Sequence, residues 1–576
     1  MHTGLLPRAL LCLGIALPLY ACRANISTSD ARNPGGTAGS SSGGASGAAG
    51  AGASTGTGAT GPLANQELAK QRCMTSNVGS PMLRRLTQQE FQHTVADIFP
   101  QIVSTWSGVK IGTDAVSTLG FSNDAATLVV AEQTAQEILS TAEDVAAHVI
   151  DDAVLPAILP CAASAADATC AAQFISQYGA RLFRRPLSTD ESKRYSDYFS
   201  SVSGRSSFKL GIKWTLVALF QSANAVYRSE VGVAGAGKYT LTQNEIATEL
   251  AYDFGGSTPS ADLLAKAAAG ALSTPDARLA EARNLLGTPN CKEAVRELFR
   301  EWSGYALVKA RTKTNTAFTG MADEMTSETR QFIDDVVFTH NGTLSDLLTL
   351  PYTFLNAKLA TYYGYGAQSA DFARADRPAN WGIGLLAQGS LLAANAHADA
   401  TSPTWRGLLV FQKMFCNTKP KPPASVPSIA VPAPGVTTTR QRYEVSHIAN
   451  PSCSACHTQW DPIGFGFEHF DELGRYRANE GGLAIDTTGY ALDDTGKKVL
   501  TFDGATDLAT QLASDPAVTD CVSGLMSEYV YAGGGGVSCL AETARTALSK
   551  GQFGLLEYLA QLSTEPQFSE RSLPAP

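Results

Sequence analysis

The chain has 576 residues, 44% of them hydrophobic and 17% charged, and its 44 Lys and Arg against 53 Asp and Glu give a net charge of −9 at pH 7. Length alone allows about three to four domains. An acidic surface repels phosphate groups, so nucleic acid is excluded as the expected partner. After residue 21, no apolar run approaches the ~20 residues that a membrane-spanning helix needs.

The first residues have the pattern of an export signal. Arg8 precedes an apolar stretch over residues 9–19, and Ala21 stands directly before Cys22, so residues 1–21 are predicted to be a cleaved secretory signal peptide. The residues before Cys22 also resemble a bacterial lipobox, in which the cysteine is lipidated; an ordinary signal followed by an unmodified cysteine is the alternative. We expect an exported protein, periplasmic or at the cell surface, held to the membrane as an outer-membrane lipoprotein.

A low-complexity segment follows. Residues 34–62 are almost entirely Gly, Ser, Ala and Thr. Such a composition buries too little side chain to offset the entropy lost on ordering, so residues 22–66 are predicted to be a lipid anchor and flexible linker.

Helical patterns dominate the chain beyond this linker. Three segments open with Ser or Thr followed three residues later by Glu, the pair that satisfies free backbone N–H groups at a helix start: Thr87 with Glu90, Ser188 with Glu191, and Thr242 with Glu245. Apolar residues at helical spacing cover 127–152, 208–227, 277–286, 292–303, 325–338 and 382–394. The predicted units are an N-terminal helical domain over 67–232 and a middle helical domain over 233–365.

The composition changes near residue 419. Prolines crowd residues 420–434, so residues 366–440 are predicted to be a helical segment that ends in an extended Pro-rich strap. The strap leads to a separate C-terminal module over 441–576. Within it, turn residues between short apolar runs predict one small β-hairpin over 484–499. The predicted fold class is therefore mainly α: a multi-helix body followed by a small α module with a short hairpin.

One motif in the C-terminal module carries specific chemistry. Cys453, Cys456 and His457 form a C-x-x-C-H string, the attachment signature of c-type haem. On one helical turn the two thiols can reach the two vinyl groups of a haem edge, and the adjacent imidazole then faces the iron as its proximal ligand. A redox dithiol or disulfide is one alternative, although no βαβ pattern surrounds the string. Zinc is another, although a second C-x-x-C or an H-x-x-x-H is missing.

The string belongs to a longer family resemblance. The run from His447 to His457, followed by residues 461–471 and 473–477, resembles the end of an exported multi-domain family found in myxobacteria and planctomycetes. That family consists of consecutive domains of unknown function and closes in a cytochrome-c-like C-x-x-C-H segment. Upstream runs around residues 84–91 and 184–191 resemble it in the same order. The resemblance implies a haem-c-type C-terminal module and a periplasmic or surface protein, and it implies no established reaction.

Further haem contacts are predicted from residue chemistry. A second axial ligand must be His or Met, and the candidates are His397, His447, His469 and Met414, with His397 favoured and His447 next. Arg475 and Arg477 are candidates for pairing with haem propionates, or else are solvated. Asp461 and Glu468 could form a carboxylate pair of the kind that hydrolases use, but they are predicted instead to be hydrogen-bond partners near the ligand, to His457.

The remaining cysteines are expected to pair in an oxidising compartment. Cys161 and Cys170 flank a short Ala- and Ser-rich segment that can loop back, so they are predicted to form a disulfide. Cys521 and Cys539 flank a glycine run and are predicted to form a second. Among Cys73, Cys291 and Cys416, at most one pair can form.

These features predict an exported, membrane-tethered monohaem c protein that transfers electrons or oxidises a substrate; an enzyme of this kind would be a haem-dependent oxidoreductase. Its expected partners are a redox protein, or a small-molecule or polysaccharide substrate. The alternative is a surface binding or structural protein that recognises polysaccharide or another envelope partner and whose C-x-x-C-H string is redox-inert. The large body without a hydrolase or nucleotide motif favours that alternative.

Overall fold

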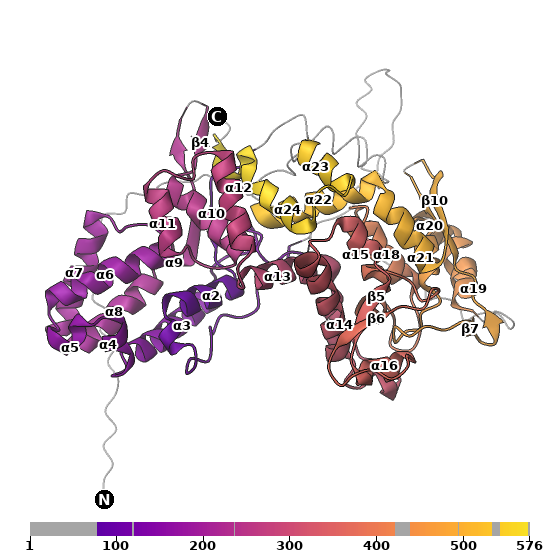
Figure 1. The fold of residues 1–576 in the computed structure, drawn as a ribbon, viewed down its shortest axis with the longest axis horizontal. Coiled ribbons are helices and arrows are strands. Elements are labelled where there is room, and N and C mark those ends of the chain that lie inside the picture. Colours follow the sequence, from indigo (N-terminus) through magenta and orange to yellow (C-terminus); the bar gives the residue numbers. More distant parts are fainter. Residues whose placement is uncertain are drawn as a thin grey trace, which may run out of the picture. The chain divides into compact units, whose positions relative to one another are not determined.

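The protein is described here by a computed structural model that covers residues 78–117, 120–235, 237–420, 438–493, 495–532 and 542–573. The predicted signal peptide, Cys22, the linker, Cys73, Cys539 and residues 421–437 of the strap lie outside this range. The described chain is mainly helical with several small sheets, which confirms the predicted fold class (Figure 1). No helix among these residues is long and apolar enough to cross a membrane.

The N-terminal helices pack around one hydrophobic core, to which Phe91 and Val95 contribute from one helix face. Strand β1 (Met82–Arg85) pairs antiparallel with β2 (Tyr227–Glu230), so the first and last segments of this region meet. The helices between them are α2 (Gln88–Ile98), η1 (Pro100–Ile102), α3 (Glu132–Val149), α4 (Val154–Ile158), α5 (Cys161–Ser164), α6 (Ala168–Phe183), α7 (Thr189–Ser203), α8 (Phe208–Phe220) and α9 (Ala223–Val226).

The predicted helix starts are confirmed. At Thr87, Ser188 and Thr242, the hydroxyl accepts a hydrogen bond from the backbone N–H three residues on, and the Glu there accepts one from the cap backbone. The helix predicted over 208–227 is instead two helices. Because the Ser222 side chain caps a new start, α8 ends at Phe220 and the short α9 leads directly into β2.

The middle of the chain is also helical, with two small sheets. The strands are β3 (Val233–Ala234), β4 (Lys238–Thr240), β5 (Tyr352–Leu355) and β6 (Ala373–Asp376), and β5 pairs antiparallel with β6. The helices are α10 (Gln243–Gly255), α11 (Ala261–Ala268), α12 (Pro275–Leu286), α13 (Cys291–Ser303), η2 (Tyr305–Ala310), η3 (Thr316–Phe318), α14 (Ala322–Asp334), the π-helical η4 (Asp335–Thr339), α15 (Leu344–Thr349), α16 (Ala357–Tyr363), η5 (Leu385–Ala387), α17 (Gly389–Ala394) and α18 (Pro403–Lys413).

The C-terminal part contains the predicted hairpin, which is confirmed: β9 (Thr488–Leu492) pairs antiparallel with β10 (Lys498–Asp503). The other strands are β7 (Asn479–Glu480), β8 (Leu483–Ala484) and β11 (Glu570–Ser572), which joins β4. The helices are α19 (Thr439–Tyr443), the π-helical η6 (Glu444–Ile448), α20 (Pro451–Gly464), η7 (Phe465–Phe467), α21 (Gly504–Ser514), α22 (Pro516–Tyr531), α23 (Glu542–Ser549), α24 (Leu555–Gln561), η8 (Leu562–Thr564) and α25 (Pro566–Ser569).

The largest hydrophobic core joins the middle and C-terminal parts. It runs without a break from Leu250 and Phe299 through Val410 to Phe502 and Val522, all of which are almost fully buried. The C-terminal segment therefore buries its apolar side chains against the middle helices and has no separate core of comparable size among the described residues.

Two disulfides are present among the described residues. Cys161 and Cys170 are bonded, as predicted. Cys521 is bonded to Cys416, so the predicted pairing of Cys521 with Cys539 is wrong. The reason is tertiary: Cys521 on α22 lies beside the end of α18, where Cys416 is held 5.3 Å away between Cα atoms.

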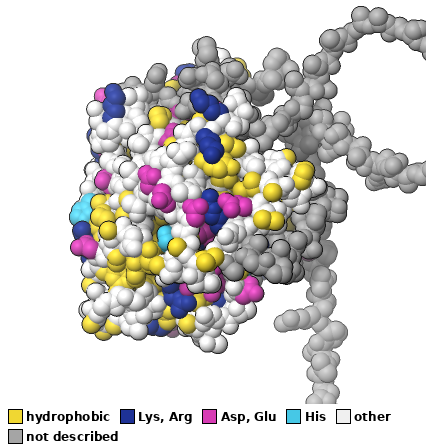
Figure 2. Space-filling view, turned by 90° about the vertical axis from the view of Figure 1, so that its right-hand side faces the viewer, with side chains coloured by type: hydrophobic (Ala, Val, Ile, Leu, Met, Phe, Trp, Pro, Cys, Tyr) yellow, Lys and Arg dark blue, Asp and Glu magenta, His cyan; other side chains and the backbone are white. Residues whose placement is uncertain are grey.

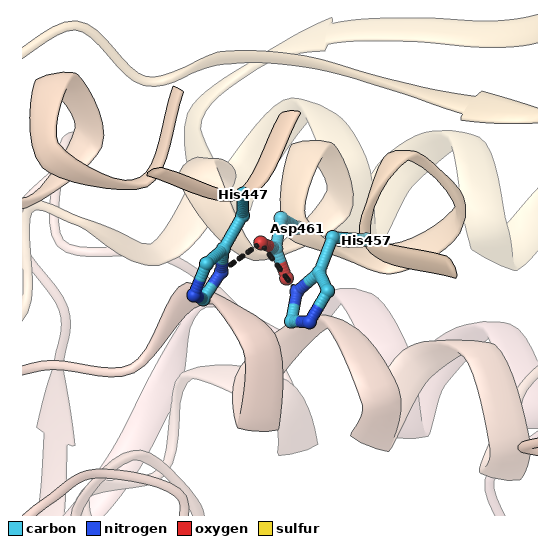
Figure 3. A group of neighbouring side chains, drawn as sticks. All are labelled: His447, His457 and Asp461. Atoms are coloured by element: carbon cyan, nitrogen blue, oxygen red, sulfur yellow. Dashed lines mark hydrogen bonds and ion pairs between the residues drawn. The ribbon is translucent and has the colours of Figure 1, made fainter. Parts of the chain in front are cut away.

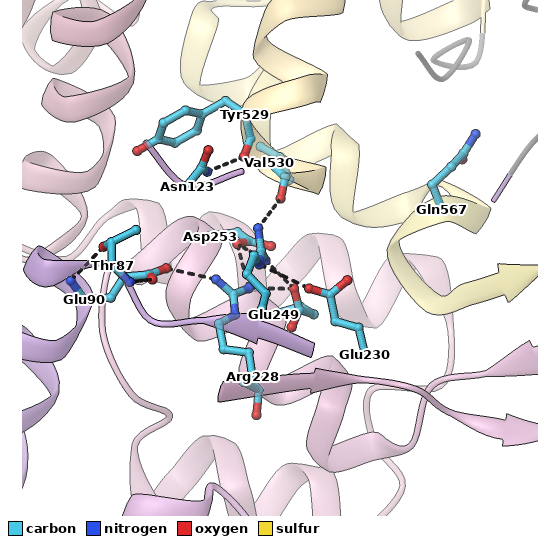
Figure 4. A network of polar contacts seen from close by, with 12 residues as sticks. Thr87, Glu90, Asn123, Arg228, Glu230, Glu249, Asp253, Tyr529, Val530 and Gln567 are labelled. Atoms are coloured by element: carbon cyan, nitrogen blue, oxygen red, sulfur yellow. Dashed lines mark hydrogen bonds and ion pairs between the residues drawn. The ribbon is translucent and has the colours of Figure 1, made fainter. Parts of the chain in front are cut away.

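A buried charge network ties the N-terminal strands to α10 (Figure 4). Arg84 and Arg228 both donate to Glu249 and Asp253, and Arg84 also lies 3.2 Å from Glu230. Burial raises the pKa of Glu249 to about 8, against the opposing charges of the two arginines. Charged groups in the protein interior have no water around them and need protein partners of opposite charge. The network supplies these partners.

Candidate functional site

The C-x-x-C-H string lies on α20, which packs closely against α18. The two helices meet at glycines: a Cβ on Gly407 would lie 1.9 Å from the backbone oxygen of Trp460, and a Cβ on Gly464 would lie 1.9 Å from that of Pro403. Only glycine permits this approach. The contact brings Thr404 of α18 next to the functional face of α20.

The two cysteines of the string lie at the start of α20. The Asn450 side chain accepts a hydrogen bond from the backbone N–H of Ser452, and Pro451 occupies the first turn, where it costs no helical hydrogen bond. Cys453 and Cys456 are free thiols, partly exposed, and three residues apart, so they share one helix face.

On the side of the molecule that carries α19, α20 and β10, histidine side chains reach a surface of mixed hydrophobic and charged groups (Figure 2).

Asp461 is the centre of the site (Figure 3). Its carboxylate is fully buried, and Oδ2 lies 2.9 Å from Nδ1 of both His447 and His457. Thr404 donates its hydroxyl to Oδ1 at 2.7 Å. Burial alone would raise the pKa of Asp461, but the bonds from the two histidines and from Thr404 hold it below its ordinary value. Because a carboxylate only accepts, each ring donates its Nδ1–H and leaves Nε2 for another partner.

The two histidines of the site stand side by side. The rings of His447 and His457 have centroids 4.0 Å apart, tilted by 46°. Aromatic carbons need about 3.5 Å to a neighbouring surface, so a porphyrin does not fit between rings this close. The predicted role of His447 as the ligand opposite His457 therefore disagrees with this arrangement. Instead, His447 and the proximal His457 are both hydrogen-bonded to Asp461.

The other predicted axial ligands lie in different surroundings. The His397 ring packs on Trp405, with centroids 4.5 Å apart, and its Nε2 lies 3.5 Å from the Tyr443 hydroxyl. His469 stacks on Tyr476 and its Nδ1 lies 2.9 Å from the backbone oxygen of Arg477. Met414 is buried in the large core. The choice of His397 as a ligand stays a prediction.

The two arginines predicted for haem propionates are paired with protein carboxylates. Arg475 lies 2.9 Å from Asp471, and Arg477 lies 3.3 Å from Glu468 and 3.2 Å from Glu480. The structure therefore gives the propionate role no support. Glu468, predicted as a partner near the ligand, instead accepts from Thr401 at 2.7 Å.

Sequence reasoning missed Thr404 and Arg406, which connect α18 to the site. The Arg406 guanidinium is buried and donates to the backbone oxygens of Phe467, Phe470 and Asp471 at 2.6–2.9 Å. Both residues lie more than 50 positions before their partners. No local pattern signals such contacts, because they depend on how α18 and α20 meet.

Four family comparisons match consecutive parts of the chain. Each family is described as a protein of unknown function: PSD3 (DUF1587) at residues 84–151, PSD5 (DUF1595) at 170–230, PSD4 (DUF1592) at 241–365 and PSCyt3 (DUF1588) at 383–480. The PSCyt3 match contains α18, α20 and the C-x-x-C-H string, and it marks a cytochrome-like module. Searches of curated proteins and of solved structures found no match. With these four domains in this order, the chain belongs to the multi-domain family in which PSD3, PSD5, PSD4 and PSCyt3 follow one another.

Proposed function

We propose that this protein is an exported, membrane-tethered monohaem c protein that transfers electrons, or oxidises a substrate, at the cell envelope. The observation that carries the proposal is the pair of free thiols on α20 beside His457, whose Nδ1 is hydrogen-bonded to the buried Asp461 carboxylate. Two disulfides support an oxidising compartment. The electron partner is a redox protein, or a small-molecule or polysaccharide substrate.

The donor set fits a covalently attached haem. Cys453 and Cys456 are unpaired and partly exposed on one helix face, as thioether formation requires. His457 has its Nδ1 occupied and its Nε2 directed away from Asp461, which suits iron ligation (Figure 3). A bound haem would supply one-electron redox chemistry to this site.

Asp461 has a definite role in this proposal. A carboxylate that accepts the Nδ1–H of a ligating histidine fixes the ring orientation and makes the ring more basic. A more basic ligand favours the higher charge on iron and so lowers the reduction potential. Thr404 and His447 also donate hydrogen bonds to the Asp461 carboxylate. They take up part of its negative charge and so reduce its effect on the reduction potential.

The experiment that tests the proposal is a pyridine haemochrome spectrum of the chain expressed with the cytochrome c maturation machinery. We expect a haem c band in the wild-type chain, loss of covalent haem in Cys453→Ser with Cys456→Ser, and full retention in Cys291→Ser. Cys291 is the matched control because its thiol is also free but is buried on α13, outside the string. A wild-type chain without the band would overturn the proposal.

A second candidate is a non-haem metal centre. Donor atoms of His447, His457 and Asp461 lie within 4.8 Å of one another. Two histidines and one carboxylate with open positions are typical of non-haem iron sites. His447→Ala separates the two proposals: it removes a ligand of the metal centre, but it leaves the two thiols and His457 that hold a haem. Metal analysis and the haemochrome band, both measured on the same sample of this variant, show which of the two centres the protein holds.

A further inference from the structure

A cleft of about 700 Å³ lies between three parts of the chain, and one of its walls is α18, the helix that packs against the C-x-x-C-H helix α20. Trp405, Leu408 and Leu409 of α18 line it, facing α13, η2 and the segment around Ser122. Leu408 also packs with Phe411 and Trp460 in a small apolar cluster that Cys456 contacts. The cleft has the volume of a small-molecule site. One layer of side chains therefore separates its interior from Cys456.

The carboxylates that line the cleft already pair with arginines, whereas the Arg311 guanidinium lies 5.3 Å from the centroid of the Trp405 ring and donates to the Ala394 backbone oxygen. Glu297 pairs with Arg300, Asp253 lies 2.7 Å from Arg228, and Lys309 lies 2.7 Å from Asp323. A cationic ligand therefore finds the carboxylates of the cleft already paired. Apolar surface from Ala306, Leu307, Leu408 and Leu409, with the Trp405 ring, lies beside carboxylates that can accept from a hydroxyl. This combination suits a neutral ring that carries hydroxyl groups.

A series of contacting rings leads from the cleft to the site. Trp405 lines the cleft, and its ring centroid lies 4.5 Å from that of His397. His397 Nε2 lies 3.5 Å from the Tyr443 hydroxyl, and the Tyr443 ring is 4.6 Å from that of His447. The His447 ring in turn lies 4.0 Å from that of His457. Each step is a van der Waals contact between rings or their polar atoms.

We propose that the cleft is the site of a phenolic electron donor, and that Trp405, His397 and Tyr443 form the path along which its electron reaches the pair of His447 and His457. The inference rests on the proposed function, because it needs a redox centre at His457. A phenol is a neutral ring with a hydroxyl donor, and it is oxidised in one-electron steps.

The reaction balances in electrons and protons. The phenol loses one electron and its O–H proton and becomes a phenoxyl radical. A haem held by Cys453, Cys456 and His457 would supply the one-electron acceptor for this electron. Glu301 is the proton acceptor: it lines the cleft, accepts from the Ser122 backbone N–H at 3.1 Å, and has a pKa that burial raises above its ordinary value.

The first test measures binding without a redox centre. Isothermal titration calorimetry of hydroquinone, with the full chain carrying Cys453→Ser and Cys456→Ser, should show one site. Adding Trp405→Leu should weaken its affinity about tenfold, as loss of an aromatic contact does. The control is Trp381→Leu, because Trp381 stacks on Tyr476 and does not line the cleft. Equal affinities in the two variants would overturn the donor site.

The second test measures electron delivery to the centre. In the haem-loaded chain, Trp405→Leu and Tyr443→Leu should slow reduction by hydroquinone about tenfold, the change that follows from about 1.4 kcal/mol of barrier. Reduction by dithionite should stay unchanged, since the His457 side chain is 23% exposed and this small ion reaches it without the cleft. Circular dichroism checks that the variants fold. Haem present with unchanged hydroquinone rates refutes the path, whereas absence of haem refutes the proposed function and leaves the calorimetry to decide the donor site.

Discussion

Gly407→Ala tests the close crossing of α18 and α20, the contact that positions the site. The added Cβ would lie 1.9 Å from the Trp460 backbone oxygen. Non-bonded contact needs about 3.5 Å, so the helices must separate by about 1.6 Å at this point. Overpacking costs about 1–3 kcal/mol, and the upper end applies because the Cβ is fixed to the backbone of one helix and the oxygen belongs to the backbone of the other, so neither can rotate away.

The measurement is urea unfolding followed by tryptophan fluorescence, with Gly366→Ala as the matched control. A Cβ on Gly366 meets no atom within 4 Å, so we expect no loss of stability there. Moving the two helices apart should also break the hydrogen bond from Thr404 to Asp461. Covalent haem loading should then fall. If Gly407→Ala unfolds at the same urea concentration as Gly366→Ala, the argument from backbone contact is refuted.

Two further predictions concern stability. In the chain-entropy account, a disulfide stabilises the fold more when it closes a longer loop: by about 2.6 kcal/mol for the separation of 9 residues from Cys161 to Cys170, and by about 4.8 kcal/mol for that of 105 from Cys416 to Cys521. Replacing both cysteines of a pair by alanine should therefore lower the midpoint of urea unfolding more for the second pair. Equal shifts of the two midpoints contradict the account. Burial raises the pKa of Glu249 from its ordinary 4.5 to about 8, so between these values the folded chain holds a proton that the unfolded chain lacks, and stability falls as pH rises through that window. Glu249→Gln should make this decline shallower in unfolding curves recorded at pH 5, 6.5 and 8; an unchanged slope shows that Glu249 does not titrate there.

What could be predicted from the sequence was local along the chain. The pairs of Ser or Thr with Glu set helix starts because both hydrogen bonds close within four residues. The contact of Asp461 with His457 was predictable for the same reason, since residues four apart share a helix face. The Cys161–Cys170 disulfide closes over one short segment.

What could not be predicted depends on which distant segments meet. Cys521 pairs with Cys416 because α22 lies beside the end of α18, whereas the glycine run suggested only a chain reversal toward Cys539. His447 was a candidate for the ligand opposite His457 because its position resembles the family pattern, but the π-helical η6 brings its ring to the same carboxylate. Neither arrangement leaves a periodic or spacing signal in the sequence.

The predicted independence of residues 441–576 leads to the last prediction. In the folded chain, the Arg406 guanidinium supplies donors to the backbone oxygens of Phe467, Phe470 and Asp471, and a disulfide joins Cys521 to Cys416. The core that holds the C-terminal helices is shared with helices before residue 415.

A fragment of residues 441–576 loses these partners together. Each buried carbonyl left without a donor costs about 1–3 kcal/mol, and the apolar faces of α21 and α22 lose the surface that covers them. We expect the fragment to bind a hydrophobic dye and to lack a cooperative urea transition, while the full chain shows one. A cooperative transition in the fragment alone would contradict this and support a self-contained module, since it requires a core that residues 441–576 can close without α18.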